Sequence, residues 1–245
     1  MANTIELVTH CWAKQLDQYG WHLQLQLSSI LHYAPLNAVL VTVCYCPQDE
    51  LTSQILDFFV EKMPHNIKRI ALAKTHLFRR AIGRNVAAKD SKADLVWFTD
   101  VDYFFGDRCF EALRLMPRHR FANLMRPAQV WRHKDWETGD RLVDSIREGG
   151  VGVVDMPNKD DFKMEHEKIA IGGLQIVPGD FARENGYLDG TKWVKPVDAS
   201  KGFRRCHCDT AFRDAYNLGR RGKETPVPNI FRIRHTKDGR DFDDD

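Results

Sequence analysis

The sequence predicts an α/β fold in which helices flank a mostly parallel central sheet. Short apolar runs alternate with helical segments in the first half of the chain, on the scale of the βαβ units that build parallel sheets. An apolar content of 43% over 245 residues supplies a core for one large domain. No internal repeat or linker divides the chain, so we expect one domain over residues 1–240 and a solvated acidic tail over 241–245.

The first half gives the clearest elements. Residues 21–33 are apolar enough for a helix, although three leucines alternate there as in a strand. We favour the helix because this segment leads into Pro35 and a strand rich in Val and Leu. The elements expected next are that strand over 38–46, a helix over 51–63, a strand over 67–73, a polar-faced helix over 78–89 and a strand over 93–99.

The second half is less regular. Residues 127–165 carry many charges and are predicted to form long loops around a site. A strand is expected over 168–177, where Gly172 and Gly173 indicate a bulge or a close backbone approach. The other expected elements are a short helix over 110–116, a strand over 121–125, a helix over 209–218 and a strand over 230–235.

Composition excludes several classes of function. The net charge is +2 and no basic block is present, so a nucleic-acid partner is not implied. No segment approaches the length of about 20 apolar residues that a membrane span needs. The first residues lack the charged start and apolar core of a signal peptide. We therefore expect a cytoplasmic protein whose six cysteines stay reduced.

The most informative residues are Thr99-Asp100-Val101-Asp102, which close the apolar run 93–99. Residues two apart on an extended backbone point to the same side. Asp100 and Asp102 would therefore converge at the carboxyl end of a strand, where open α/β sheets bind ligands. Hard divalent cations prefer such oxygen ligands and share them with substrate phosphates. The sequence predicts a site for a metal and a diphosphate; a solvated turn is the alternative.

Several other segments complete an ordered set along the chain. In order, the set is Gly83-Arg84-Asn85, Phe98-Thr99-Asp100-Val101-Asp102, Ile171-Gly172-Gly173-Leu174, Phe181-Ala182-Arg183-Glu184-Asn185-Gly186-Tyr187, Cys208-Asp209-Thr210-Ala211-Phe212-Arg213 and Ile233-Arg234-His235-Thr236-Lys237-Asp238. This order resembles the GT-A fold of inverting glycosyltransferases, in particular the β-1,4-galactosyltransferase family and the broader glycosyltransferase family 2. The resemblance spans residues 75–238.

The resemblance implies a GT-A-like, Rossmann-like domain, a UDP-sugar donor, Mn²⁺ (or Mg²⁺) and a saccharide or other hydroxyl-bearing acceptor. At matching positions it implies that Asp102 binds the metal directly, with Asp100 supporting the metal or the donor ribose. His235 would be the third protein ligand of the ion, with an ordinary strand-end histidine as the alternative. Arg80 and Arg84 would approach the donor, or else form only a solvated helix face.

On the acceptor side, the resemblance implies that Gly172 and Gly173 let the acceptor and the sugar lie against the backbone. Asp209 would be the catalytic base, and a helix N-cap is the compatible alternative. Trp193 is the tryptophan we expect to stack on a sugar, in a segment 189–205 that would close over the donor.

Near the start, Thr9-His10-Cys11 and the region of Asp49 are expected to touch the nucleotide base, because such folds begin their nucleotide site there. Two other positions depart from the family pattern. Cys208 stands where the family has Glu, and Arg232 stands where the galactosyltransferases have a Met ligand. These departures leave two rival functions open: a nucleotidyltransferase of related architecture, and a sugar- or nucleotide-binding module without catalysis.

Overall fold

The computed structural model describes residues 2–13, 18–196 and 207–234. Within these residues the central sheet has seven strands, in the order β10 (Lys223–Thr225), β6 (Met125–Pro127), β9 (Gln175–Pro178), β4 (Leu95–Phe98), β1 (Ile5–Cys11), β2 (Val39–Tyr45) and β3 (Ile67–Ala71). Strands β4, β1, β2 and β3 are parallel, as are β10 and β6, whereas β9 is antiparallel to both of its neighbours. The predicted α/β class with a mostly parallel sheet is confirmed.

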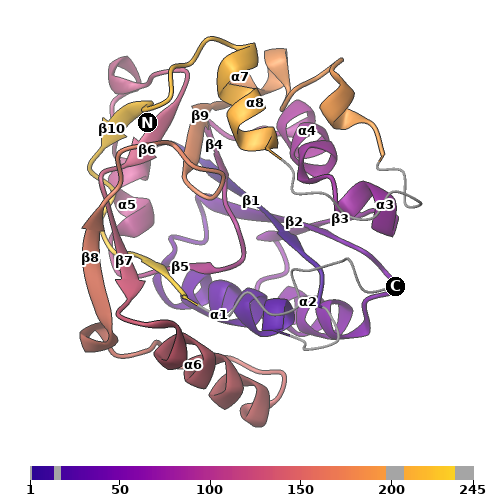
Figure 1. Cartoon of the computed structure of the whole chain (residues 1–245), viewed down its shortest axis with the longest axis vertical. Coiled ribbons are helices and arrows are strands. Elements are labelled where there is room, and N and C mark those ends of the chain that lie inside the picture. The colour runs from indigo at the N-terminus through magenta and orange to yellow at the C-terminus, as the bar shows by residue number, and fades with distance from the viewer. Residues whose placement is uncertain (1, 14–17, 197–206, 235–245) are drawn as a thin grey trace.

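Helices cover both faces of this sheet (Figure 1). One side carries α1 (Gln18–Tyr33) and α2 (Glu50–Lys62), and the other carries α4 (Arg80–Asp90), α7 (Gly179–Asn185) and α8 (Cys208–Ala215). Strand alternation explains why two cores form. In β4, Leu95 and Trp97 belong to the core under α1 and α2, whereas Val96 and Phe98 belong to the core under α4 and α8.

A second, four-stranded sheet is described beside the first, in the order β5 (Tyr103–Phe105), β11 (Ile230–Arg232), β7 (Gln129–His133) and β8 (Phe162–His166). The remaining elements are α3 (Lys74–Leu77), α5 (Cys109–Arg114), α6 (Trp136–Gly149) and the 3₁₀ turns η1 (Arg118–Arg120), η2 (Lys159–Asp161) and η3 (Lys192–Val194). None of the helices in the described ranges combines the length and apolar character needed to cross a bilayer.

The largest error of the sequence analysis concerns residues 127–165, which were expected to be loops. They form β7, α6 and β8. The side chain of Asp135 caps α6 by accepting a hydrogen bond from N of Thr138, and the helix buries Gly139, Val143 and Ile146 at helical spacing. The many charges of α6 lie on its outer face. They raise the average polarity of the segment, and for this reason the narrow buried stripe was not recognised in the sequence.

Two other expectations need correction. Of the segment 168–177 that was expected to be a strand, only the part in β9 is one. Gly172 and Gly173 lie in a turn before it. The turn is fixed by hydrogen bonds that Arg84 and Trp97 donate to the two glycine carbonyls, so it does not continue the ladder. The sequence analysis also missed β1, although it is a central strand, because polar residues interrupt its apolar pattern. The acidic tail over 241–245 lies outside the described residues.

Candidate functional site

Asp100 and Asp102 lie where the strand order of the central sheet reverses. Strand β1 has β2 on one side and β4 on the other, so the carboxyl ends of β1 and β4 flank a topological switch point. Residues 99–102 connect β4 of the central sheet to β5 of the second sheet. Nε2 of Gln26, from α1, donates hydrogen bonds to the carbonyls of Asp100 (3.0 Å) and Tyr103 (2.8 Å). The loop is therefore held by its backbone, with both carboxylates left to other partners.

The carboxylate of Asp100 is paired with two arginines of α4. Oδ1 accepts hydrogen bonds from Nη1 of Arg80 and from Nη2 of Arg84, the latter at 3.1 Å. Burial by itself raises the pKa of Asp100, but the charges of Arg80, Arg84 and Arg232 outweigh it and lower the pKa from 3.8 to about 2. Asp100 is therefore an anion at every physiological pH.

Arg84 is fully buried, with 0% of its side chain exposed. Besides Asp100, its guanidinium donates to the carbonyls of Thr99 (3.2 Å) and Gly172 (2.9 Å) and to the hydroxyl of Tyr187 (3.0 Å). One buried cation thus joins the end of β4, the glycine turn and the segment after α7. The sequence predicted Arg84 near the donor, and in the structure its Nη groups are bonded to other groups of the protein.

Asp102 has a different environment. It is 4% exposed, and its Oδ2 accepts a hydrogen bond from Nε of Arg232 at 2.9 Å. The guanidinium carbon of Arg232 lies 5.2 Å from the ring centroid of Tyr103, which fixes the orientation of the group. Oδ1 of Asp102 is buried and accepts no hydrogen bond from the part of the chain that the structure describes. This carboxylate is therefore held on one oxygen only.

Gly172 lies between Asp100 and Asp209. A Cβ atom at Gly172 would lie 3.5 Å from Cβ of Asp209 and 3.8 Å from Oδ2 of Asp100. Gly172 is buried, and the side chains of Asp209, Arg84 and Asp100 all lie within van der Waals reach of it. Gly173 faces the other way, because a Cβ on it would meet the ring of Tyr103, with Cδ2 at 3.0 Å. The predicted sites at Gly172, Asp100 and Asp209 are thus brought together.

Asp209 belongs to the first turn of α8, whose N-cap residue is His207. The alternative role of Asp209 as the N-cap is therefore wrong. Its backbone carbonyl accepts a hydrogen bond from Nε2 of Gln175 at 3.2 Å, and Nη1 of Arg213 lies 3.9 Å from Oδ2. The side chain of Asp209 is 26% exposed, so solvent reaches its carboxylate.

The other predicted donor residues near the start are Thr9 and Asp49. Thr9 is buried in β1, and its hydroxyl makes no hydrogen bond with any described residue. Asp49 is the N-cap of α2: Oδ1 accepts from N of Thr52 (3.2 Å), and Oδ2 accepts from N of Ala13 (2.6 Å) and Oγ1 of Thr52 (2.6 Å). Asp49 thus joins the segment after β1 to α2.

Trp193 and His235 were predicted on segments that come late in the chain. Trp193 lies in η3, where the guanidinium carbon of Arg79 is 5.5 Å from its ring centroid, so it packs beside the start of α4. His235 and most of the segment 189–205, namely residues 197–205, lie outside the described residues.

His10, near the end of β1, belongs to the run Thr9-His10-Cys11 that was expected to touch the nucleotide base, and its ring lies against Gly83 of α4. Burial, followed by the charges of Arg84 and Arg80, lowers the pKa of His10 well below 6.5, so the ring is neutral. A Cβ at Gly83 would collide with this ring and would lie 2.6 Å from Sγ of Cys44. Gly83 therefore lets α4 approach β1 closely and brings Arg80 and Arg84 over the switch point.

The described residues do not fit the predicted divalent ion. Among them, no group of three His, Cys, Asp or Glu side chains is placed to hold an ion. Asp100 and Asp102 are each bonded to a guanidinium, and three arginines face two carboxylates. Only the unpartnered Oδ1 of Asp102 favours a cation. Both carboxylates of the predicted ligand set are thus already paired with arginines, and His235, its third member, lies outside the described residues.

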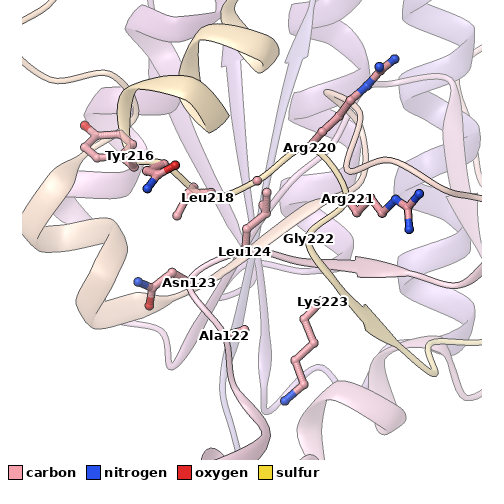
Figure 2. A pocket seen from close by; sticks show the side chains of 11 residues that line it. Ala122, Asn123, Leu124, Tyr216, Leu218, Arg220, Arg221, Gly222 and Lys223 are labelled. Atoms are coloured by element: carbon pink, nitrogen blue, oxygen red, sulfur yellow. The ribbon is translucent and has the colours of Figure 1, made fainter.

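A cavity of about 610 Å³ lies elsewhere, beside β6 and β10. Its cationic lining residues are Arg220, Arg221 and Lys223. Figure 2 shows that these three side chains point in different directions. Nζ of Lys223 donates to the carbonyl of Arg120 at 2.7 Å. Because its charges do not converge, this cavity offers no built anion site, and the carboxylate–arginine cluster remains the candidate functional site.

No protein-family model matches the chain, and no curated protein sequence matches it. Solved structures do resemble it. GalNAc-T7 with UDP, GalNAc and Mn²⁺ superposes with a TM-score of 0.60 at 11% identity, over 96% of this chain and 44% of that one. TarS 1-349 of S. aureus gives 0.58 at 13% identity, over 94% and 60%.

A third similar structure is the mannosyltransferase PcManGT from Pyrobaculum calidifontis with GDP-Man and Mn²⁺. It gives a TM-score of 0.55 at 12% identity, over 98% of this chain and 59% of that one. The chain therefore spans between 44% and 60% of the length of these three proteins. At such identities the likeness shows the fold alone, and the fold is GT-A.

Proposed function

We propose that this chain is an inverting glycosyltransferase that moves a sugar from a UDP-sugar to an acceptor hydroxyl. The observation that carries the proposal is the proximity of the Asp100 and Asp209 side chains across Gly172, beside the carboxyl ends of the parallel strands. The GT-A fold supports it, since two of the similar structures contain UDP or GDP-Man. The narrower likeness to β-1,4-galactosyltransferases stays a prediction from the sequence.

In the proposed reaction, the acceptor hydroxyl attacks the anomeric carbon of the donor sugar while its proton passes to the Asp209 carboxylate. The new bond joins the acceptor oxygen to the anomeric carbon. The bond from that carbon to the phosphate oxygen breaks, and its electron pair leaves with UDP. A single base opposite a single leaving group makes the displacement in line, so the configuration inverts. Holding both substrates across Gly172 removes much of the entropy of a two-body encounter.

The arginine-held loop would orient the donor. Arg84 fixes the carbonyls of Thr99 and Gly172, and it also holds Asp100, so these groups form one rigid wall. Arg80, with 38% of its side chain exposed, is a cation of this wall that a diphosphate can reach. Contacts of the nucleotide with Thr9 or Asp49, and of the acceptor with Gly173 or Trp193, remain predictions. So does dependence on Mn²⁺ or Mg²⁺, although two similar structures contain Mn²⁺.

The first experiment is a donor panel. The full chain is incubated with UDP-sugars and GDP-mannose, with Mn²⁺ or with excess chelator, and the released nucleoside diphosphate is measured with a set of saccharide acceptors. We expect release of UDP and an inverted product. Release of pyrophosphate would favour the rival nucleotidyltransferase, and tight UDP binding without turnover on any acceptor would favour the binding module.

The second experiment tests the base. Asp209→Asn should lower the transfer rate by about 10²–10⁴-fold while leaving UDP affinity unchanged, because a general base contributes to the chemical step and not to donor binding. Asp214→Asn is the matched control, since Asp214 is exposed on the same helix. Loss of both transfer and UDP binding in Asp209→Asn, or full activity, would show that the base is misplaced.

A further inference from the structure

Five charged side chains meet at the Asp-x-Asp loop, and cations outnumber anions among them. They are Arg80, Arg84, Asp100, Asp102 and Arg232. Arg80 and Arg84 pair with Asp100, and Arg232 pairs with Asp102. These five side chains together carry an excess of positive charge, which favours an anion, although Oδ1 of Asp102 has no partner among the described residues.

The three arginines differ in what they have left to offer a ligand. Arg84 is buried, and its Nη groups donate to Tyr187, Thr99, Gly172 and Asp100. Arg80 donates through Nη1 to Asp100. Arg232 has 25% of its side chain exposed and donates through Nε to Asp102. Its Nη1 and Nη2 groups donate no hydrogen bond to any residue in the described ranges, so Arg232 combines a fixed orientation with two unused Nη groups.

Such a fixed guanidinium matches a phosphate. The Asp102 carboxylate and the Tyr103 ring hold the group, so little side-chain entropy remains to be lost when a ligand binds. The two Nη groups form the edge that binds phosphate oxygens in parallel, and such charge-assisted bonds are about twice as strong as neutral ones. Arg80, partly exposed on the Asp100 side, adds a second cation to the same loop.

We propose that Arg232 binds the diphosphate of a nucleoside diphosphate together with Arg80, so that donor binding and release of the leaving group need no divalent ion. This inference rests on the proposed function and deepens it at the same site. When the bond to the sugar breaks, its electron pair resides on the terminal phosphate oxygen, and the Nη groups of Arg232 stabilise the developing charge through hydrogen bonds.

The test is UDP binding by calorimetry in excess chelator, with no acceptor present. Wild type should bind, and added Mn²⁺ should change its Kd by less than about threefold, whereas loss of charged hydrogen bonds in Arg232→Met should weaken binding by about ten- to a hundredfold. Arg232→Lys, which keeps the charge, should retain part of the affinity. Arg147→Met is the matched control, because it removes an exposed arginine of α6 that pairs with Asp144.

Two results would overturn the inference: wild type that binds UDP only with a divalent ion, or Arg232→Met that binds as wild type does in chelator. If Arg232→Met does not fold, the wild-type chelator titration and Arg232→Lys still decide. Since no sugar is transferred in this assay, its outcome is separate from the proposed function. UDP binding in chelator without turnover on any donor and acceptor would contradict the glycosyltransferase and leave the role of Arg232 standing.

Discussion

The two carboxylates of the Asp-x-Asp loop lie in opposite surroundings. Asp100 is held by two arginines from one turn of α4, and one of these, Arg84, is sealed in the interior. Among the described residues, Asp102 is held by Arg232 alone, which comes from β11 at a separation of 130 residues and reaches the surface. The Asp100 side is therefore a rigid platform, whereas the Asp102 side has spare donors and a spare acceptor oxygen.

The comparison shows that a short acidic motif does not determine its own chemistry. Residues two apart present similar carboxylates, yet the partners that surround them decide whether each is a structural anion or part of a ligand site. If the two sides differ as described, substitutions on the Asp100 side should damage the fold, and matched substitutions on the Asp102 side should damage ligand binding.

The largest expected effect comes from Arg84→Met. Arg84 is fully buried, and breaking a buried ion pair typically costs about 3–5 kcal/mol, although Arg80 still pairs with Asp100. The carbonyls of Thr99 and Gly172 would also lose their donor. Arg232→Met should cost less, about 1–3 kcal/mol, because Arg232 is 25% exposed and water admitted in its place can hydrate the buried Asp102 carboxylate. Urea unfolding of both variants measures the difference, and equal losses would remove the distinction between the two sides.

Gly172 and Gly173 extend the comparison, because the same change from glycine to alanine can be made at both positions. Gly173→Ala drives a methyl group into the ring of Tyr103, which is buried, so we expect a loss of about 1–3 kcal/mol from overpacking. A methyl group on Gly172 meets only contacts of 3.5 Å or more, so Gly172→Ala should fold normally. It should nevertheless lower transfer at least tenfold, because the methyl group adds bulk between the side chains of Asp100 and Asp209.

Thermal unfolding and a transfer assay on both glycine variants check this pair. The fold-intact Gly172→Ala serves as the control for general damage in Gly173→Ala. Normal transfer by Gly172→Ala would contradict the placing of substrates beside Gly172, on which the proposed function depends.

The next expected effect is the loss of the stability contribution of Asp100 in acid. The pKa of Asp100 is lowered from 3.8 to about 2 in the folded protein, although burial opposes this. A lowered carboxyl pKa contributes stability above about pH 4, and that contribution is lost as the pH falls through about 2. The stability difference between wild type and Asp100→Asn should therefore be largest at pH 5 and should shrink by pH 2.5. Urea titrations across this range measure it, and a constant difference would contradict the ion pairing.

The sequence predicted the strand and the helix that carry the Asp100 side, but it did not predict the pairing of Asp102 with Arg232. The strand before Asp100 and the helix of Arg80 and Arg84 are local patterns, and both were predicted to within a few residues. The pairing of Asp102 with Arg232 depends on β11 reaching β5 and β7, a contact that only the folded chain creates. In the sequence, Arg232 was only a departure from the pattern of the family that the chain resembles. In the structure it donates a hydrogen bond to Asp102, which explains why an arginine stands there.

The burial of Arg84 was another property that could not be predicted from the sequence. Arg84 was expected near the donor because guanidinium groups suit phosphates, and nothing local distinguishes it from the more exposed Arg80. The distinction arises from Gly83, which lets α4 approach β1 and directs Arg84 inward to Gly172 and Tyr187. Likewise, α6 was taken for a loop because its buried stripe is short relative to its charged face.

The smallest expected effect concerns the basic cavity beside β6 and β10, which serves as a third region for comparison. Arg220 and Arg221 are exposed there and point apart, unlike the convergent arginines of the Asp-x-Asp loop (Figure 2). Exposed substitutions away from special features usually change stability by less than about 0.5 kcal/mol. Arg220→Gln and Arg221→Gln should therefore leave both urea unfolding and UDP affinity unchanged. A loss of UDP affinity in either variant would move the nucleotide site to this cavity, whereas weaker transfer at unchanged UDP affinity would identify the cavity as part of the acceptor path.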